Sequence, residues 1–400
     1  MALNSFVFVL LTCLAVLACR LLAPSMIRNL LIMLLSVYFM ATYMAGWEQV
    51  GVLAGFLGSV YLIGVAKARA VRQWPAVVSF LIVAIFWVGL FLLKDPALMP
   101  VVNPFHAHPI KIIGISYIVF RGITFVLEAS PSVRPSALTF VNYMLFFPTL
   151  LAGPIERYRR FDEASAQPLG WQHTYYPAIN RILNGFIKKF VIADNLMDLG
   201  IFSMATSGQD FSLPVLWFGA LLMLALLYLD FSGYCDIVIG IAALMGFKMV
   251  ENFNAPFSAK NLQEFWGRWH MSLGAVIQDY VFSPLSKVVI TQVPRNLQLY
   301  GIASIYLLAM VLVAMWHGTT LGFLIFGVFQ GAVLFMIQVR RELLRASAKA
   351  RGVKVTAHPV SVVSVWIGRI STYVFVSLTM IWWQASLPDA LKTFQKLAGG

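Results

Sequence analysis

Long apolar runs, separated by short polar or basic segments, dominate the pattern of this chain. A helix needs about 20 mainly apolar residues to cross the hydrocarbon core of a bilayer, and about eleven runs approach that length. We therefore predict an all-α bundle of about eleven transmembrane helices in one membrane-embedded domain over residues 1–400. The predicted spans cover residues 5–23, 26–44, 47–66, 76–94, 110–128, 137–152, 213–229, 232–247, 298–316, 319–338 and 360–383.

Two segments depart from this pattern of simple spans. Residues 174–205 mix apolar and charged positions, which predicts an amphipathic helix at the membrane interface. Residues 248–297 alternate aromatic and polar positions and contain prolines, which predicts an interfacial or re-entrant segment. Irregular backbone at membrane depth must be buried in protein or line a wet cavity. We therefore expect a cavity near His270 in the second segment.

The composition agrees with a membrane protein, since 60% of the residues are hydrophobic and only 11% are charged. A soluble domain is typically about 25% charged. The net charge of +13 does not indicate nucleic acid as a partner, because the short cytoplasmic loops of membrane proteins collect basic residues. The basic run in residues 339–354 is compatible with a helix on the anionic inner membrane surface. Two smaller clusters are Lys67, Arg69 and Arg72, and Arg157, Arg159 and Arg160.

Cysteine usage and known motifs exclude several kinds of chemistry. Cys13, Cys19 and Cys235 are odd in number and lack a paired spacing, so neither a disulfide framework nor a metal site is predicted. No Lys or Arg precedes the first apolar run, so residues 5–23 are interpreted as a retained membrane helix rather than a signal peptide. The chain has no Gly-x-Ser-x-Gly elbow, nucleotide loop, zinc signature or dinucleotide fingerprint. This argues against covalent serine catalysis, nucleotide hydrolysis and redox chemistry.

Two histidines in tryptophan-rich apolar sequence are the main candidates for chemistry. His270 lies in residues 265–273, and His317 lies in residues 315–318. An ionisable side chain within the membrane is costly and is usually functional. His317 stands in a stretch without Lys, Arg, Asp or Glu, and Gly318 after it permits a helix break and the close approach of a substrate. A neutral imidazole can act as general base toward a hydroxyl that attacks an acyl carbonyl.

Each histidine also has a structural interpretation. His317 could be a core histidine that hydrogen-bonds a neighbouring helix, and His270 could belong to an interfacial aromatic belt. Glu264 and Arg268 are four residues apart, so a helical ion pair is plausible. Trp266 and His270 would share a helical face if this segment is helical.

Asp230 and Asp236 lie in a short segment that joins two predicted spans. They could be capping residues of a helix–helix turn. They could instead orient a nearby histidine or arginine. The sequence leaves both interpretations open.

At these residues the chain resembles the membrane-bound O-acyltransferase family. The resemblance rests on four ordered segments, residues 228–236, 251–257, 264–273 and 315–318, which define a motif core of about 228–318. Residues 147–161 and 114–121 also resemble the bacterial members of the family.

The resemblance implies a ring of membrane helices, with a funnel from the outer side and a central tunnel to the cytoplasm. It places His317 at the base of the funnel as general base, and His270 toward the cytoplasmic end, where it positions the thioester or protonates the leaving thiolate. It also implies a multi-pass protein of the cytoplasmic (inner) membrane. The implied supporting residues are Trp316, Trp269, Trp266, Arg268, Asp230, Asp236 and Asn252.

The same resemblance implies the substrates and partners. The donor would be an acyl thioester on a phosphopantetheine arm, carried by a small acidic carrier protein, with no resident cofactor or metal. The acceptor would be a hydroxyl group of a cell-envelope polymer. Envelope proteins that relay the acyl group onward are possible further partners beside the lipid bilayer.

Two branches of the family differ in the group that they transfer. One transfers D-alanine to teichoic-acid-like polymers, and the other O-acetylates exopolysaccharides or peptidoglycan. The short length, Met271 after His270, residues 153–161 and the histidine separation (317 − 270 = 47) favour D-alanyl transfer. Residues 274–278 and 284–287 depart from the pattern of the acetylating members, with Pro-Leu-Ser-Lys in place of Pro-Leu-Gly-Gly. A polytopic transporter whose histidines relay protons is a remote alternative.

Overall fold

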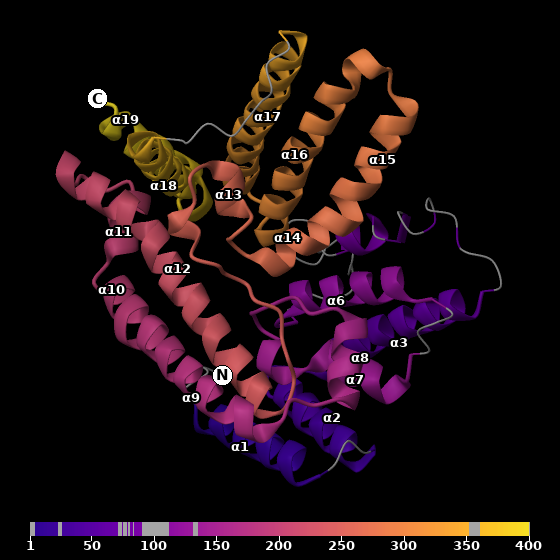
Figure 1. Ribbon diagram of the computed structural model, residues 1–400. Coiled ribbons are helices and arrows are strands. Elements are labelled where there is room, and N and C mark those ends of the chain that lie inside the picture. The colour runs from indigo at the N-terminus through magenta and orange to yellow at the C-terminus, as the bar shows by residue number, and fades with distance from the viewer. Residues whose placement is uncertain are drawn as a thin grey trace. The chain divides into compact units, whose positions relative to one another are not determined.

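The computed structural model describes residues 5–22, 26–70, 112–130, 135–351 and 361–399, together with a few positions between 74 and 89. The chain forms two compact units (Figure 1). Unit 1 comprises Met1–Lys188 and Phe231–Val250, and unit 2 comprises Lys189–Asp230 and Glu251–Gly400. The long helix α12, Leu213–Leu244, contributes its first part to unit 2 and its second part to unit 1.

Unit 1 is built from apolar helices that pack in pairs, α1 on α2, α2 on α7 and α3 on α6. Arg20, in the last turn of α1, donates hydrogen bonds to the carbonyl oxygens of Leu244, Leu169 and Ala243 at 2.6–2.9 Å. The bonds to Ala243 and Leu244 satisfy carbonyls in the last turn of α12, where a helix lacks internal partners for its carbonyls. The other helices are α1 (Phe6–Leu21), α2 (Met26–Ala41), α3 (Trp47–Arg69), α6 (Ile115–Glu128), α7 (Ala137–Leu145), α8 (Tyr158–Ala166) and α9 (Trp171–Phe186), with the 3-10 turn η1 (Phe147–Thr149).

A buried arginine holds the turn that follows α7. Arg121 is 1% exposed, and its guanidinium donates to the carbonyl oxygens of Tyr143, Met144 and Thr149 at 2.7–3.0 Å. Such bonds are required because a buried charge without hydrogen-bond partners is strongly destabilising.

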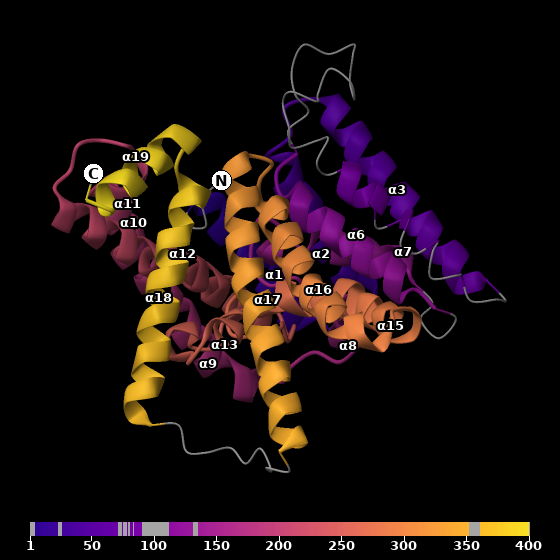
Figure 2. The ribbon, with the colours of Figure 1, turned by 90° about the horizontal axis from the view of Figure 1, so that it is seen from above.

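Unit 2 has a core of long helices, in which α16 packs along α17, and α17 packs against α18 (Figure 2). Glycines allow α16 and α17 to approach closely. A Cβ atom at Gly331 would lie 2.7 Å from Leu307 Cα, so a larger residue requires the helices to separate. The elements are η2 (Ile187–Ala193), α10 (Asp194–Asp198), α11 (Ile201–Thr206), η3 (Pro256–Ser258), α13 (Leu262–Trp266), α14 (Met271–Ile277), η4 (Gln278–Phe282), α15 (Ser283–Gln292), α16 (Arg295–His317), α17 (Leu321–Ala350), α18 (Val362–Gln384) and α19 (Leu387–Leu397).

The predicted all-α polytopic membrane bundle is confirmed. The described part of the chain holds six helices that are long and apolar enough to cross a membrane. Much of the predicted span 76–94 lies outside the described residues. The six helices are Trp47–Arg69, Leu213–Leu244, Met271–Gln292, Arg295–His317, Leu321–Ala350 and Val362–Gln384, and shorter apolar helices are Val7–Leu21, Met26–Ala41 and Ala137–Thr149.

One predicted boundary is wrong. The spans 213–229 and 232–247 form one 32-residue helix, α12, so Asp230 and Asp236 do not lie in a turn. A helix can continue through them because both carboxylates are paired with cations. The predicted interfacial or re-entrant segment 248–297 contains a continuous helical stretch, Met271–Gln292. A π-helical turn, η4, lies within that stretch, and Pro284 falls in the first turn of α15, where proline is tolerated.

Candidate active site

His270 lies in one of two irregular segments of unit 2 that pair with each other. These segments are residues 252–254 and residues 268–271. Phe253 and Trp269 form an isolated antiparallel bridge. The Met271 amide donates to the Asn252 carbonyl oxygen at 2.9 Å on one side of His270. The His270 backbone is left-handed, with φ of 46°. A non-glycine residue in this conformation persists only where its surroundings hold it, and such residues cluster at functional sites.

The predicted ion pair between Glu264 and Arg268 is confirmed, with 2.7 Å between Oε1 and Nη2. Arg268 also donates to the Asn254 carbonyl oxygen at 3.3 Å and to Ser258 Oγ at 3.1 Å. The Lys260 amide donates to the second Glu264 oxygen, and this bond together with Arg268 lowers the pKa of the Glu264 carboxyl. Arg268 therefore links α13 to residues 254–258, next to the segment that contains His270.

Asn252 fixes the tautomer of His270. The Ser272 backbone amide, which can only donate, meets Asn252 Oδ1 at 3.3 Å, and Ser272 Oγ lies 2.8 Å from the same atom. That atom is therefore the amide oxygen, an acceptor. His270 Nδ1 lies 3.0 Å from it and must carry the proton. The lone pair of the imidazole is then on Nε2.

His270 lies between α13 and α14, just ahead of the span Met271–Gln292, and is 5% exposed. Burial lowers the pKa of its imidazole from 6.5 to about 3, because the charged form loses its hydration. The ring is therefore neutral at physiological pH. A neutral ring with Nδ1–H engaged presents an acceptor, not a donor, at Nε2.

His317 ends α16 and lies among aromatic rings. Its ring centroid is 4.4 Å from that of Trp316 and 4.3 Å from that of Trp383, which belongs to α18. Gly318 follows it, and a Cβ there would lie 2.1 Å from the Phe323 ring, so only glycine allows this packing. Trp383 is not among the site residues predicted from the sequence. Its only signal was a Trp-Trp pair near the end of the last apolar run.

The two histidines are close neighbours. Their ring centroids are 6.4 Å apart, and the Trp316 ring contacts both, at 6.0 Å from His270. The expectation that they lie toward opposite ends of a route across the membrane is therefore not met. Rings this close satisfy the proximity that two side chains need if they are to act on one acyl group.

Trp266 and Trp269 flank the segment that contains His270 and pack into the core of unit 2. The expected shared helical face of Trp266 and His270 is not formed, because α13 ends at Trp266. The Trp266 indole N–H donates to Gln330 Oε1 at 3.1 Å, and the buried Gln330 donates in turn to Thr379 Oγ1 at 2.6 Å. Trp269 is buried and packs on Phe253 and Phe265, with ring centroids 5.2 and 5.5 Å away.

The two aspartates of α12 pair with cations. In unit 1, Asp236 accepts from Arg181 Nε at 3.0 Å and from Lys188 Nζ at 2.7 Å. In unit 2, Asp230 pairs with Lys189, whose ammonium lies 3.3 Å from an Asp194 oxygen. The capping interpretation is wrong, because both aspartates lie within α12, and Asp236 pairs with Arg181.

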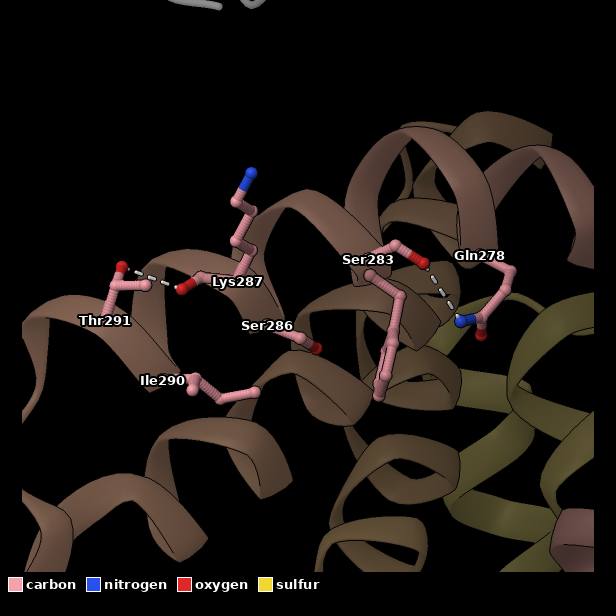
Figure 3. A pocket seen from close by; sticks show the side chains of 7 residues that line it. Gln278, Ser283, Ser286, Lys287, Ile290 and Thr291 are labelled. Carbon is pink, nitrogen blue, oxygen red and sulfur yellow. Dashed lines mark hydrogen bonds between the residues drawn. The ribbon is translucent and has the colours of Figure 1, made fainter.

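The segment that departs from the family pattern borders a shallow hollow of about 420 Å³ on η4 and α15 (Figure 3). Gln278 Nε2 donates to Ser283 Oγ at 3.3 Å at one end, and Thr291 Oγ1 donates to the Lys287 carbonyl oxygen at 2.9 Å at the other. Ser286 and Lys287, in the positions of two glycines of the family pattern, give this wall hydroxyl and ammonium groups. The lining residues are Gln278, Phe282, Ser283, Ser286, Lys287, Ile290 and Thr291.

The sequence of the chain is similar to one protein family and to several bacterial proteins. The model of the MBOAT family, membrane-bound O-acyltransferases, matches residues 123–382, which include both histidines. A probable alginate O-acetylase of Azotobacter vinelandii is 30% identical over 333 residues, which are 78% of this chain and 64% of that protein.

Two relatives of other kinds match at similar identity. A teichoic acid D-alanyltransferase of Bacillus subtilis is 32% identical over 60% of this chain and 64% of its own length. A peptidoglycan O-acetyltransferase of Helicobacter pylori is 32% identical over 68% of this chain and 50% of its own length. The chain thus spans less than two thirds of the length of each of these relatives.

Proposed function

The chain belongs to the membrane-bound O-acyltransferase family, and we propose that it transfers a short acyl group to a hydroxyl group of a cell-envelope polymer. The observation that carries the proposal is the close approach of His270 and His317, with ring centroids 6.4 Å apart, on the family's motif segments. The relatives named above act on alginate, teichoic acid or peptidoglycan, which are all cell-envelope or extracellular polymers bearing hydroxyl groups.

In the proposed reaction, His317 takes the proton from the acceptor hydroxyl as its oxygen attacks the carbonyl carbon of a thioester. A carbon–oxygen bond forms, the carbon–sulfur bond breaks, and the thiolate receives the proton that His317 had taken. The reaction needs no further reactant. The half-buried position of His317 between two indole rings supports this role, because water is largely excluded from the base.

Two roles are expected for His270, positioning the thioester or protonating the leaving thiolate, and its tautomer favours the first. With the Nδ1 proton held by Asn252, Nε2 can accept a hydrogen bond but has no proton to give to a thiolate. His270 therefore positions the donor, by accepting from an N–H or O–H group of the thioester arm. Protonation of the leaving thiolate is left to His317.

For the donor, we propose an acyl group carried on the phosphopantetheine arm of a small acidic carrier protein, which the net charge of +13 would attract. D-alanine is the first candidate acyl group, on the sequence features that resemble the D-alanyl-transferring branch. Acetate is the second, because relatives named alginate O-acetylases cover 76–78% of the chain, against 60–68% for the D-alanyltransferases.

The test of function uses a deletion strain and reconstituted vesicles. Mass spectrometry of the envelope polymers from the deletion strain should show loss of esterified alanine or of esterified acetate. His317→Ala should abolish transfer in vesicles, whereas His173→Ala, at an exposed histidine of α9, should keep it. Near-normal transfer by the His317→Ala protein would refute the role of His317, and unchanged polymers would refute the proposed function.

A further inference from the structure

One face of α17 carries a shallow apolar groove of about 520 Å³. The residues recur at helical spacing along the C-terminal half of the helix and so share a face. Met336, Leu343 and Leu344 are 57%, 51% and 57% exposed, so no other part of the described chain covers them. The groove is lined by Phe335, Met336, Val339, Arg340, Leu343, Leu344 and Ser347.

The groove lies at the expected edge of the hydrocarbon layer. Residues 321–339 of α17 hold no Lys, Arg, Asp or Glu, and at 1.5 Å per residue they extend roughly 28 Å. This length matches a hydrocarbon core of about 30 Å. Arg340 is the first charge after it. The basic run that begins at Arg340 indicates the cytoplasmic side, where the leaflet is rich in anionic lipids.

Arg340 differs from the neighbouring arginines. Arg341 donates to Gln263 Oε1 at 3.1 Å, Arg345 pairs with Glu342 at 2.7 Å, and Arg351 donates to Ser347 Oγ at 2.6 Å. Arg340 makes no hydrogen bond or ion pair with the described part of the chain, and it is exposed. Its planar guanidinium can bind a phosphate through two parallel hydrogen bonds.

We propose that this groove is a binding site for an anionic phospholipid. The phosphate binds Arg340, one acyl chain packs on Phe335, Met336 and Val339 toward the membrane centre, and the head group beyond the phosphate lies over Leu343 and Leu344. Because Arg340 has no partner among the described residues and lies in an apolar groove, this site should retain one lipid molecule rather than attract lipid diffusely. This inference does not depend on the proposed acyl transfer.

Native mass spectrometry of the full-length protein in detergent tests the site, with phosphatidylglycerol and phosphatidylcholine of the same acyl chains as probes. The wild-type protein should retain one phosphatidylglycerol in preference to phosphatidylcholine. Arg340→Gln should lower that retention about fivefold, since one basic side chain at an anionic surface accounts for roughly this factor. The matched control Lys349→Gln removes the same charge from the same helix outside the groove, and it should retain lipid as the wild type does.

Two further arms separate a groove from a simple charge effect. Met336→Gln makes the groove polar where the acyl chain packs, without changing its charge, and should lower retention even though Arg340 is intact. Soluble glycerol 3-phosphate should not compete, because it lacks the acyl chain. The proposal is overturned if Arg340→Gln and Lys349→Gln lower retention equally, if neither lowers it, or if glycerol 3-phosphate displaces the lipid.

Discussion

At the scale of single residues, one oxygen atom of Asn252 determines which nitrogen of His270 carries the proton. Asn252→Ala removes the acceptor of the Nδ1–H bond, which leaves a buried donor without its partner and frees the ring to change tautomer. We expect transfer to fall about 10- to 100-fold, because a buried polar group left without its partner costs about 1–3 kcal/mol. Asn252→Asp keeps an oxygen acceptor and should be less impaired. Equal loss in both variants would contradict this account.

The buried imidazole of His270 also predicts how stability depends on pH. Its pKa falls from 6.5 to about 3 on folding, so the folded protein binds fewer protons than the unfolded chain between these values. The free energy of unfolding should therefore decline as the pH falls below about 6.5, by up to about 1.4 kcal/mol per pH unit. Thermal unfolding in detergent from about pH 7.5 to 5 measures this. The stability of the His270→Gln protein should depend less steeply on pH. An equally steep dependence would show that His270 is not its cause.

Trp383 is predicted to position His317. Trp383→Leu removes the ring that lies 4.3 Å from the imidazole, so the turnover rate should fall about tenfold or more while KM changes little. Trp383→Phe keeps an aromatic ring and should recover most of the rate. The neighbouring Trp382 stacks on Phe394, with ring centroids 4.8 Å apart, and Trp382→Leu is the matched control. If Trp382→Leu slows turnover as much as Trp383→Leu, the effect is only structural.

At the scale of elements, the close approach of α16 and α17 depends on glycine. Gly331→Ala would place a Cβ 2.7 Å from Leu307 Cα, and overpacking of this kind costs about 1–3 kcal/mol. Gly58→Ala, in α3, is the control, because a Cβ at that position would have no neighbour within 4 Å in the described part of the chain. That change should be neutral or stabilising by up to about 1 kcal/mol. Melting temperatures in detergent compare the two, and a Gly331→Ala protein as stable as wild type would refute this packing.

The helical elements follow closely from the apolar pattern where spans are bounded by polar loops, as for α3, α16 and α18. The pattern failed at α12 because Asp230 and Asp236 interrupt the apolar run, and their cation partners come from residues about 40 to 55 positions away. Tertiary pairing of this kind leaves no local signal. Within residues 248–297 the apolar pattern did not reveal the helical stretch Met271–Gln292, because polar residues and a proline interrupt it and the helix continues through a π-helical turn.

At the scale of the whole molecule, the motif residues could be recognised from the sequence, but their arrangement could not. His270 and His317 are 47 residues apart (317 − 270 = 47), and nothing in that spacing shows that a left-handed residue and a helix end bring their rings together. Trp383 and Gln330 were missed because an aromatic or amide side chain in an apolar run is usually part of the core. Contacts between distant helices assign them to the site.

The central claim is that His270 and His317 act together on one acyl group. A double-mutant cycle tests it most directly, with transfer measured in reconstituted vesicles for His270→Ala, His317→Ala and the double variant. Residues that act as a unit are strongly non-additive, so the double variant should be little worse than His317→Ala alone. If the two losses instead multiply, or if His317→Ala retains near-normal transfer, the two histidines do not form one catalytic site.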